Sequence, residues 1–205
     1  MGLDDFAKYF AADGPASVWE RQSLVKARVV IGSRAAATRA VQILASAAYD
    51  RQWTADEVES IRQMRFRMEQ GARPSNLKRG PGGVVDIEFA VQVLQLVHGG
   101  KEPGLRTPET LSGLLALRES GHLEDEPCAF LEKSYRMLRA IEGRLRLLDA
   151  VDRHDFPADA EEQRTLAHLL GYAHPDALVD DVQAITARTR REFDAIFDRT
   201  VGALR

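Results

Sequence analysis

The side chains best suited to chemistry gather in one glycine-rich stretch near the middle of the chain. Two cations, Lys78 and Arg79, come first, and a turn with Gly80, Gly82 and Gly83 follows them directly before an apolar run. Free N–H groups at the start of a helix can bind an anion, and neighbouring cations would add to that attraction. The stretch lacks the Gly-Lys-Ser/Thr ending of a P-loop. It therefore predicts either an anion site of another kind or a tight turn whose glycines adopt positive φ.

The apolar run at residues 84–97 predicts a helix that is hydrophobic around most of its circumference, and such a helix should be central and mostly buried. Its polar residues Glu88, Gln92 and Gln95 share one narrow stripe, and Asp86 lies on the opposite side. Because an unpaired buried carboxylate is costly, Asp86 needs a cationic partner. The candidates on other predicted helices are Arg28, Arg139 and Arg144.

Glu142 is a second carboxylate beside an apolar stripe. Arg139 precedes it by three residues and Arg146 follows it by four. This spacing favours an ordinary ion pair on a helix surface.

His154 and Asp155 form a His-Asp pair of the kind that helical metal phosphohydrolases use. A metal site would need further ligands from neighbouring helices. The other candidate ligands are His98, His122 and Asp180. However, Phe156-Pro157 follows at once, which favours a loop or a helix end at this position.

The residues for metal-dependent nucleotidyl transfer are missing from the sequence. That chemistry needs paired carboxylates that hold Mg²⁺ against phosphate oxygens. The usual arrangement is a Gly-Ser turn followed by Asp-x-Asp on a strand, and Gly32-Ser33 is not followed by Asp-x-Asp. No combination of nucleophile, base and orienting group suggests a hydrolase triad either. We therefore expect no catalytic residue and no metal ligand in this chain.

The elements that must position these residues are helices, because apolar residues recur at helical spacing almost everywhere. Ala37, Val41, Leu44 and Ala48 share one helix face, for example. Period-two alternation is short-lived, and no Asn-Gly or Asp-Gly hairpin turn is present. The pattern predicts an all-α bundle of seven or eight helices. We expect one helical domain over residues 1–205, with a sub-bundle boundary near residues 71–83.

Several helix ends carry recognisable signals. Residues 54–57 read as a capping box, and Thr107-Pro108 reads as a helix start. Residues 159–162 cap another helix, and His174-Pro175-Asp176 begins the last one. Gly121 and Gly171 are expected helix stops.

Composition excludes several classes of protein. The 205 residues are 44% hydrophobic with a formal net charge of −3, which argues against a general nucleic-acid binder. No run of about 18 apolar residues predicts a membrane span. Cys128 is the single cysteine, so no internal disulfide can form, which fits a reducing cytosol.

Three stretches together resemble the glutamine synthetase adenylyltransferase family. The segment that closes that family's nucleotidyltransferase domain is similar to residues 19–28, which read Trp-Glu-Arg-Gln-Ser-Leu-Val-Lys-Ala-Arg. The family's most recognisable run resembles residues 76–89, from Asn-Leu-Lys-Arg through Gly-Gly-Val-Val-Asp-Ile-Glu-Phe. A long helix of the family matches residues 135–145. The resemblance covers most of the chain in one register, and the glycine run is its specific part.

The resemblance implies a helical domain that follows a nucleotidyltransferase domain absent from this chain. Enzymes of the family carry two such pairs of domains. One half attaches AMP to a tyrosine of glutamine synthetase, the other removes it by phosphorolysis, and PII-type signalling proteins set the direction. The ending at Arg205 favours the second, adenylylating half, although residues 148–157 also resemble the first. ATP and Mg²⁺ would belong to the catalytic domain, the isolated chain would be inactive, and the location would be cytoplasmic.

The residues that match the family's glycine run are Lys78, Arg79, Gly80, Gly82, Gly83, Asp86 and Glu88. We expect this loop to face the catalytic domain, where it would hold nucleotide phosphates or brace the active-site wall. Two other functions stay open from the sequence. One is a free-standing helical adaptor without enzymatic role, and the other is a metal phosphohydrolase that uses His154 and Asp155.

Overall fold

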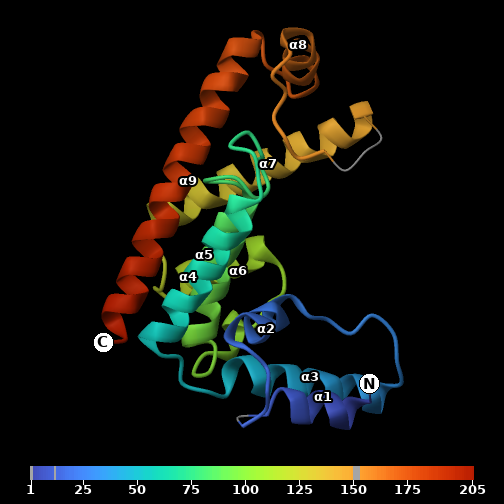
Figure 1. Ribbon diagram of the computed structural model, residues 1–205, viewed down its shortest axis with the longest axis vertical. Helices are drawn as coiled ribbons and strands as arrows, with labels where there is room; N and C mark the ends of the chain where they lie inside the picture. Colours follow the sequence, from blue (N-terminus) through green and yellow to red (C-terminus); the bar gives the residue numbers. More distant parts are fainter. Residues whose placement is uncertain (1, 12, 150–152) are drawn as a thin grey trace. The chain divides into compact units, whose positions relative to one another are not determined.

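The computed structural model describes residues 2–11, 13–149 and 153–205, and the predicted all-α class is confirmed there. The described residues form nine α-helices, close to the seven or eight expected, and two short 3₁₀ helices (Figure 1). The elements are α1 (Leu3–Tyr9), α2 (Val18–Ser23), η1 (Leu24–Lys26), α3 (Arg34–Tyr49), α4 (Ala55–Gln70), α5 (Val84–His98), η2 (Pro103–Leu105), α6 (Thr110–Glu119), α7 (Asp125–Asp149), α8 (Ala160–Leu169) and α9 (Pro175–Ala203).

The chain divides into two compact units. The first comprises Met1–Met64, Ala90–Glu124 and Phe197–Arg205, and the second comprises Arg65–Phe89 and Asp125–Ile196. The glycine-rich loop at residues 71–83 lies wholly inside the second unit. Along the described ranges, no helix is both long enough and apolar enough to cross a membrane.

The helix ends follow local hydrogen bonding. Thr54 and Glu57 form the expected capping box, in which the Glu57 amide donates to Thr54 Oγ1 at 3.3 Å and Glu57 Oε2 accepts from the Thr54 amide at 3.0 Å. Asp159 caps α8 by accepting from two backbone amides. Gly121 and Gly171 follow α6 and α8 with φ of 77° and 80°, the left-handed conformation expected of a glycine stop.

The predicted start of α6 at Thr107-Pro108 is wrong. The helix begins at Thr110, with Glu109 as the N-cap. The reason is a competing hydrogen bond, because Gln95 Nε2 donates to the Thr107 carbonyl at 2.9 Å and to the Leu105 carbonyl at 2.7 Å. The Thr107 carbonyl therefore points at a buried side chain and does not open a helical turn.

Helix α5 is the buried helix that its composition predicts. Val84, Ile87, Ala90, Val93 and Leu96 each expose 1% of their surface or less. Its first six residues belong to the second unit and its remainder to the first. The glycine-rich loop leads directly into its N-terminus, so the loop is anchored to the interior of the second unit.

Candidate functional site

At three positions of the glycine-rich loop, neighbouring backbone leaves no room for a side chain. Gly82 has φ of 71°, and a Cβ atom added there would lie 1.8 Å from the Thr186 carbonyl oxygen of α9. Added Cβ atoms at Gly80 and Gly83 would lie 2.5 and 2.6 Å from the carbonyl oxygens of Asn76 and Leu77. Real Cβ atoms do not approach backbone that closely, so Gly82 allows the loop to lie against α9, and Gly80 and Gly83 allow it to fold back on its own backbone.

From Asn76 to Asp86, every backbone amide of the loop and of the helix start donates within the protein. The Lys78 and Arg79 amides both donate to Asn76 Oδ1, at 3.2 and 2.8 Å. The Gly82 amide donates to Asp86 Oδ2 at 2.7 Å. The remaining amides from residue 80 to residue 86 donate to carbonyl oxygens of Asn76, Leu77, Lys78, Gly80 and Gly83. An anion at this loop would therefore be held by side chains rather than by the glycine amides.

Two arginines, Arg65 in the interior and the partly buried Arg190, neutralise Asp86, and they are not the predicted ones. Arg65 Nε of α4 lies 2.5 Å from Asp86 Oδ1, and Arg190 Nε of α9 lies 3.0 Å from Asp86 Oδ2. Arg65 and Asp86 are both fully buried. Of the candidates taken from the sequence, Arg28 and Arg144 are exposed and Arg139 pairs with Glu142. The expectation that Asp86 needs a cation is confirmed, but its identity is corrected.

The same cluster fixes the glycine loop. Arg65 Nη2 donates to the Gly80 carbonyl at 2.9 Å, and Arg65 Nη1 lies 3.2 Å from Glu69 Oε2. Glu69 also pairs with Arg190. Burial raises the pKa of Asp86 to about 6, against the lowering effect of Arg65, Arg190 and the Gly82 N–H. At neutral pH the cluster thus contains two carboxylates and two guanidinium groups that balance one another.

Residues 154–156 brace the other side of the loop. The Leu77 amide donates to the His154 carbonyl at 2.8 Å, and Phe156 donates to the Ser75 carbonyl at 2.8 Å. Asn76 Nδ2 donates to Asp155 Oδ1, also at 2.8 Å. These hydrogen bonds between residues 75–77 and residues 154–156 hold the loop in place.

Glu142 is buried against His154 rather than exposed on the helix surface. Its ion pair with Arg139 is present, at 2.6 Å, but its side chain is only 3% exposed, so the predicted surface location is wrong. Its second oxygen lies 3.1 Å from His154 Nδ1, and Lys78 Nζ lies 3.4 Å from His154 Nε2. The burial follows from position, because Glu142 sits between Leu138 and Leu145 on the apolar stripe of α7.

His154 and Asp155 do not form the centre of a metal site among the residues described. His154 contacts Glu142 and Lys78, whereas Asp155 contacts Asn76 and lies 3.6 Å from Arg73 Nη1. Over residues 2–11, 13–149 and 153–205, no group of three or more His, Cys, Asp or Glu side chains is placed to hold a metal ion. These two residues support the glycine loop.

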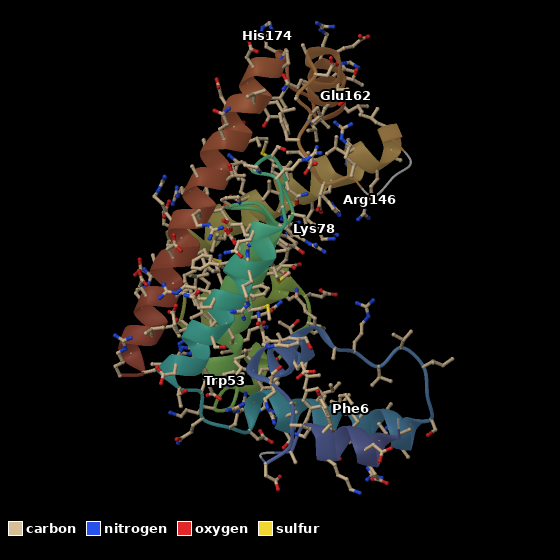
Figure 2. All side chains as sticks on the ribbon, in the orientation of Figure 1. Phe6, Trp53, Lys78, Arg146, Glu162 and His174 are labelled. Atoms are coloured by element: carbon tan, nitrogen blue, oxygen red, sulfur yellow. The ribbon has the colours of Figure 1, made fainter. Side chains whose placement is uncertain are left out.

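The predicted site residues divide into an interior group and a surface group. Gly80, Gly82, Gly83 and Asp86 are buried. Glu88 is half-buried and accepts a hydrogen bond from the Tyr135 hydroxyl at 3.2 Å. Lys78 is half-buried and Arg79 is exposed, and Figure 2 labels Lys78 at the turn that leads into α5. Lys78 and Arg79 are the cations of this set that reach the surface.

Sequence reasoning missed Arg65 and Arg190, although a signal existed for the first. Val58, Ile61, Arg65 and Met68 follow one another at helical spacing, which places Arg65 on the buried face of α4. Arg190 is flanked by Thr189 and Phe193 on α9, and nothing in the local sequence separates it from the exposed Arg191.

Comparisons with known proteins agree on one family. The family model described as GlnD PII-uridylyltransferase matches residues 48–198. A bifunctional glutamine synthetase adenylyltransferase/adenylyl-removing enzyme of Xanthomonas campestris pv. campestris (strain B100) is 35% identical over 197 residues, which is 94% of this chain. Enzymes of the same description from Aromatoleum aromaticum and Streptomyces avermitilis are 32% and 34% identical over 95% and 88% of the chain. The chain spans only 21%, 21% and 19% of these three relatives.

Proposed function

The chain belongs to the family that the GlnD PII-uridylyltransferase model defines, and we propose that it serves as a helical domain of a bifunctional glutamine synthetase adenylyltransferase/adenylyl-removing enzyme. The observation that carries this proposal is similarity to such enzymes over nearly the whole chain. In this proposal the chain supports nucleotidyl transfer by a neighbouring catalytic domain and is inactive alone. It acts in the cytoplasm, with glutamine synthetase and a PII-type signalling protein as partners.

ATP and Mg²⁺ would be held by the catalytic domain. The described residues of this chain provide no carboxylate cluster of the kind that holds Mg²⁺ against phosphate, so we assign no metal ligand to them. The chain would contribute charge and rigidity beside that site.

The glycine loop is the surface that would meet the catalytic domain. Lys78 and Arg79 lie on a turn in which their own amides are hydrogen-bonded and Gly82 packs against α9. A lysine offers a compact positive charge, and an arginine can bind two phosphate oxygens at once. Because the turn is already rigid, these cations would bind nucleotide phosphates or acidic side chains with little loss of conformational entropy.

The test replaces both cations in an enzyme that contains this chain and its catalytic domain. Hydrogen bonds to charged groups contribute roughly 1.5–3 kcal/mol each, so we expect Lys78→Ala with Arg79→Ala to lower adenylyl transfer to glutamine synthetase at least about tenfold. The matched control replaces Lys133 and Arg191, exposed cations of the same unit, and should leave the rate within about twofold. Full activity in the loop variant would show that the loop is only structural.

A second measurement addresses the adaptor alternative. If the enzyme transfers AMP equally well when this chain is deleted, the chain supports no nucleotidyl transfer and the proposal fails. If activity requires the chain but survives the loop substitutions, the family role stands and the assignment of Lys78 and Arg79 is overturned.

A further inference from the structure

Two histidines of the first unit stack face to face where two helices end. His98 is the last residue of α5, and His122 lies just beyond the end of α6. The centroids of the two imidazole rings are 3.7 Å apart, and the ring planes differ by 16°. Both side chains are half-buried. The sequence made both of them candidate metal ligands, but in the described ranges they belong to no group of three possible ligands.

Glu102 fixes the ring of His122 from the connection between α5 and α6. Its Oε1 atom lies 2.7 Å from His122 Nε2, and its side chain is 43% exposed. Because an ionised carboxylate is only an acceptor, Nε2 carries a hydrogen in both the neutral and the charged ring. Acid therefore adds the second proton of His122 at Nδ1, and Glu102 balances the resulting charge.

The charges that act on His98 do not favour a second imidazolium ion. Burial lowers the pKa of His98, and the neighbouring His122 lowers it further. Glu102 raises this pKa and Lys101 lowers it, so the two charged residues of the connection act in opposite directions. One carboxylate thus serves two stacked rings, which is enough for one positive charge and too little for two.

The element packed against this end of α5 is the last turn of α3. A Cβ atom added to Gly99 would lie 2.8 Å from Tyr49 Cδ1. The Arg106 guanidinium lies 5.1 Å from the centre of the Tyr49 ring, and its Nη2 is 3.5 Å from Asp50 Oδ1, so the charges of Arg106 and Asp50 offset each other. Burial raises the pKa of Tyr49 to about 12, which keeps it neutral. Between about pH 8 and pH 5 the change of charge therefore falls on the two histidines.

Two charged rings cannot remain stacked at 3.7 Å, because like charges this close repel strongly when they are partly removed from water. A neutral ring, in contrast, stacks well on a neutral or a charged one. We propose that His98 and His122 form an acid-sensitive latch that joins the end of α5 to the segment after α6. The latch is closed while at most one ring is charged and opens when both are. It consists of contacts within the first unit, so its test is independent of the proposed function.

The direction of the pH dependence follows from the environment of His98. A lowered pKa means that the folded chain binds this proton less readily than the unfolded chain, in which the value is near 6.5. The stability that the closed latch contributes is therefore complete above about pH 6.5 and is lost as pH falls below that value. Opening separates His122 and the attached Glu102 from α5, so the connection at residues 99–109 gains freedom.

The first test follows the imidazole rings by NMR as the 205-residue chain is acidified from about pH 8. Stacked rings should titrate as a coupled pair, in which the second proton binds at a pH at least about one unit below the first. Nuclear Overhauser contacts between the two rings should disappear with the second proton. His168 and His174, which are exposed in the second unit, serve as single histidines and should show one step each. Independent one-step titrations of His98 and His122 overturn the latch.

Hydrogen exchange reports opening directly. The amides of His122 and Leu123 both donate to the Leu117 carbonyl, at 2.9 and 3.1 Å, and hold the segment after α6 in place. After correction for the intrinsic pH dependence of exchange, both amides should exchange at least about tenfold faster below the second titration step than above the first. Unchanged protection contradicts the proposal.

The end of α8 provides a matched control. Gly121 and Gly171 follow α6 and α8 with similar positive φ, 77° and 80°. After Gly171 the Tyr172 amide donates to the Ala167 carbonyl at 2.9 Å, the same bond that His122 makes after Gly121. Exchange at this end should change less than about twofold over the same range. Equal acceleration at both ends would indicate general loosening in acid, and the latch would then be wrong.

Two substitutions separate charge from packing. His98→Phe keeps an aromatic ring against His122 but cannot be charged, so acid should no longer speed exchange at residues 122 and 123. His122→Gln keeps a donor for Glu102 and removes the other titrating ring, and it tests the same point if phenylalanine does not fit. Each variant is compared with the parent at the same pH, because Asp86 of the second unit has a pKa of about 6. Acceleration as large as in the parent, in either folded variant, refutes the latch.

Discussion

Replacing Asp86 with alanine should be among the most destabilising single changes in the second unit. The substitution leaves Arg65, which is fully buried, without the carboxylate 2.5 Å from its Nε atom. It also removes the acceptor of the Gly82 amide and one partner of Arg190. Breaking a buried ion pair by removing one partner costs roughly 3–5 kcal/mol, because an uncompensated charge remains in the interior.

The measurement is urea and thermal unfolding at pH 8, where the Asp86 carboxyl is ionised because its pKa of about 6 lies lower. For a chain of this length each kcal/mol corresponds to about 2–4 °C, so the melting temperature should fall by roughly 10 °C. The matched control is Asp198→Ala. Asp198 also pairs with an arginine, Arg62 at 2.6 Å, but its side chain is 68% exposed, so its loss should cost less than about 1 kcal/mol.

A double substitution tests the cause. If the cost comes from the charge left on Arg65, then Arg65→Met combined with Asp86→Leu should recover much of the loss, since apolar residues of similar volume replace buried pairs well. Equal, small effects of Asp86→Ala and Asp198→Ala would refute the electrostatic account of this cluster. A double variant no better than Asp86→Ala would show that the Gly80 and Gly82 contacts matter more than charge.

Two further predictions follow from close packing and from burial. Gly82→Ala should lower the free energy of unfolding in urea by about 2 kcal/mol or more, because φ at Gly82 is positive and the new Cβ would collide with the Thr186 carbonyl. The control is Gly143→Ala on α7, where a Cβ meets nothing within 4 Å, and it should be neutral or stabilising. An equal effect of the two would contradict the account of the loop. Burial raises the pKa of Tyr49 to about 12, above the value near 10 of an unfolded chain. The stability that Tyr49 contributes relative to Tyr49→Phe should therefore be complete below pH 10 and decline by roughly 2 kcal/mol as pH rises to 12, and a pH-independent difference would contradict this.

Local pattern was sufficient to predict the helices and the burial of α5, because both depend on short-range periodicity. Local pattern also identified the burial of Asp86 and its need for a cation. It could not identify the partner, because Arg65 and Arg190 reach Asp86 from helices that are distant in sequence. The predicted start of α6 was wrong for the same reason, since the Gln95 side chain binds the Thr107 carbonyl from a distant part of the sequence.

The roles of His154 and Glu142 show a further limit. A His-Asp pair and a helical Glu-Arg pair have the same appearance in sequence whether they are exposed, bind a metal or brace a loop. Only the fold shows that residues 154–156 lie along residues 75–77 and that Glu142 is beneath them. Sequence therefore indicated which residues carry charge, and tertiary contacts decided what each charge does.

The glycine loop depends on contacts within the second unit, and this dependence predicts how it fails. The turn at residues 76–83 is complete without a partner, because its amides and the buried charge of Asp86 are satisfied internally. Substitution of its glycines or of Asp86 should therefore lower the stability of the chain even when no partner is present.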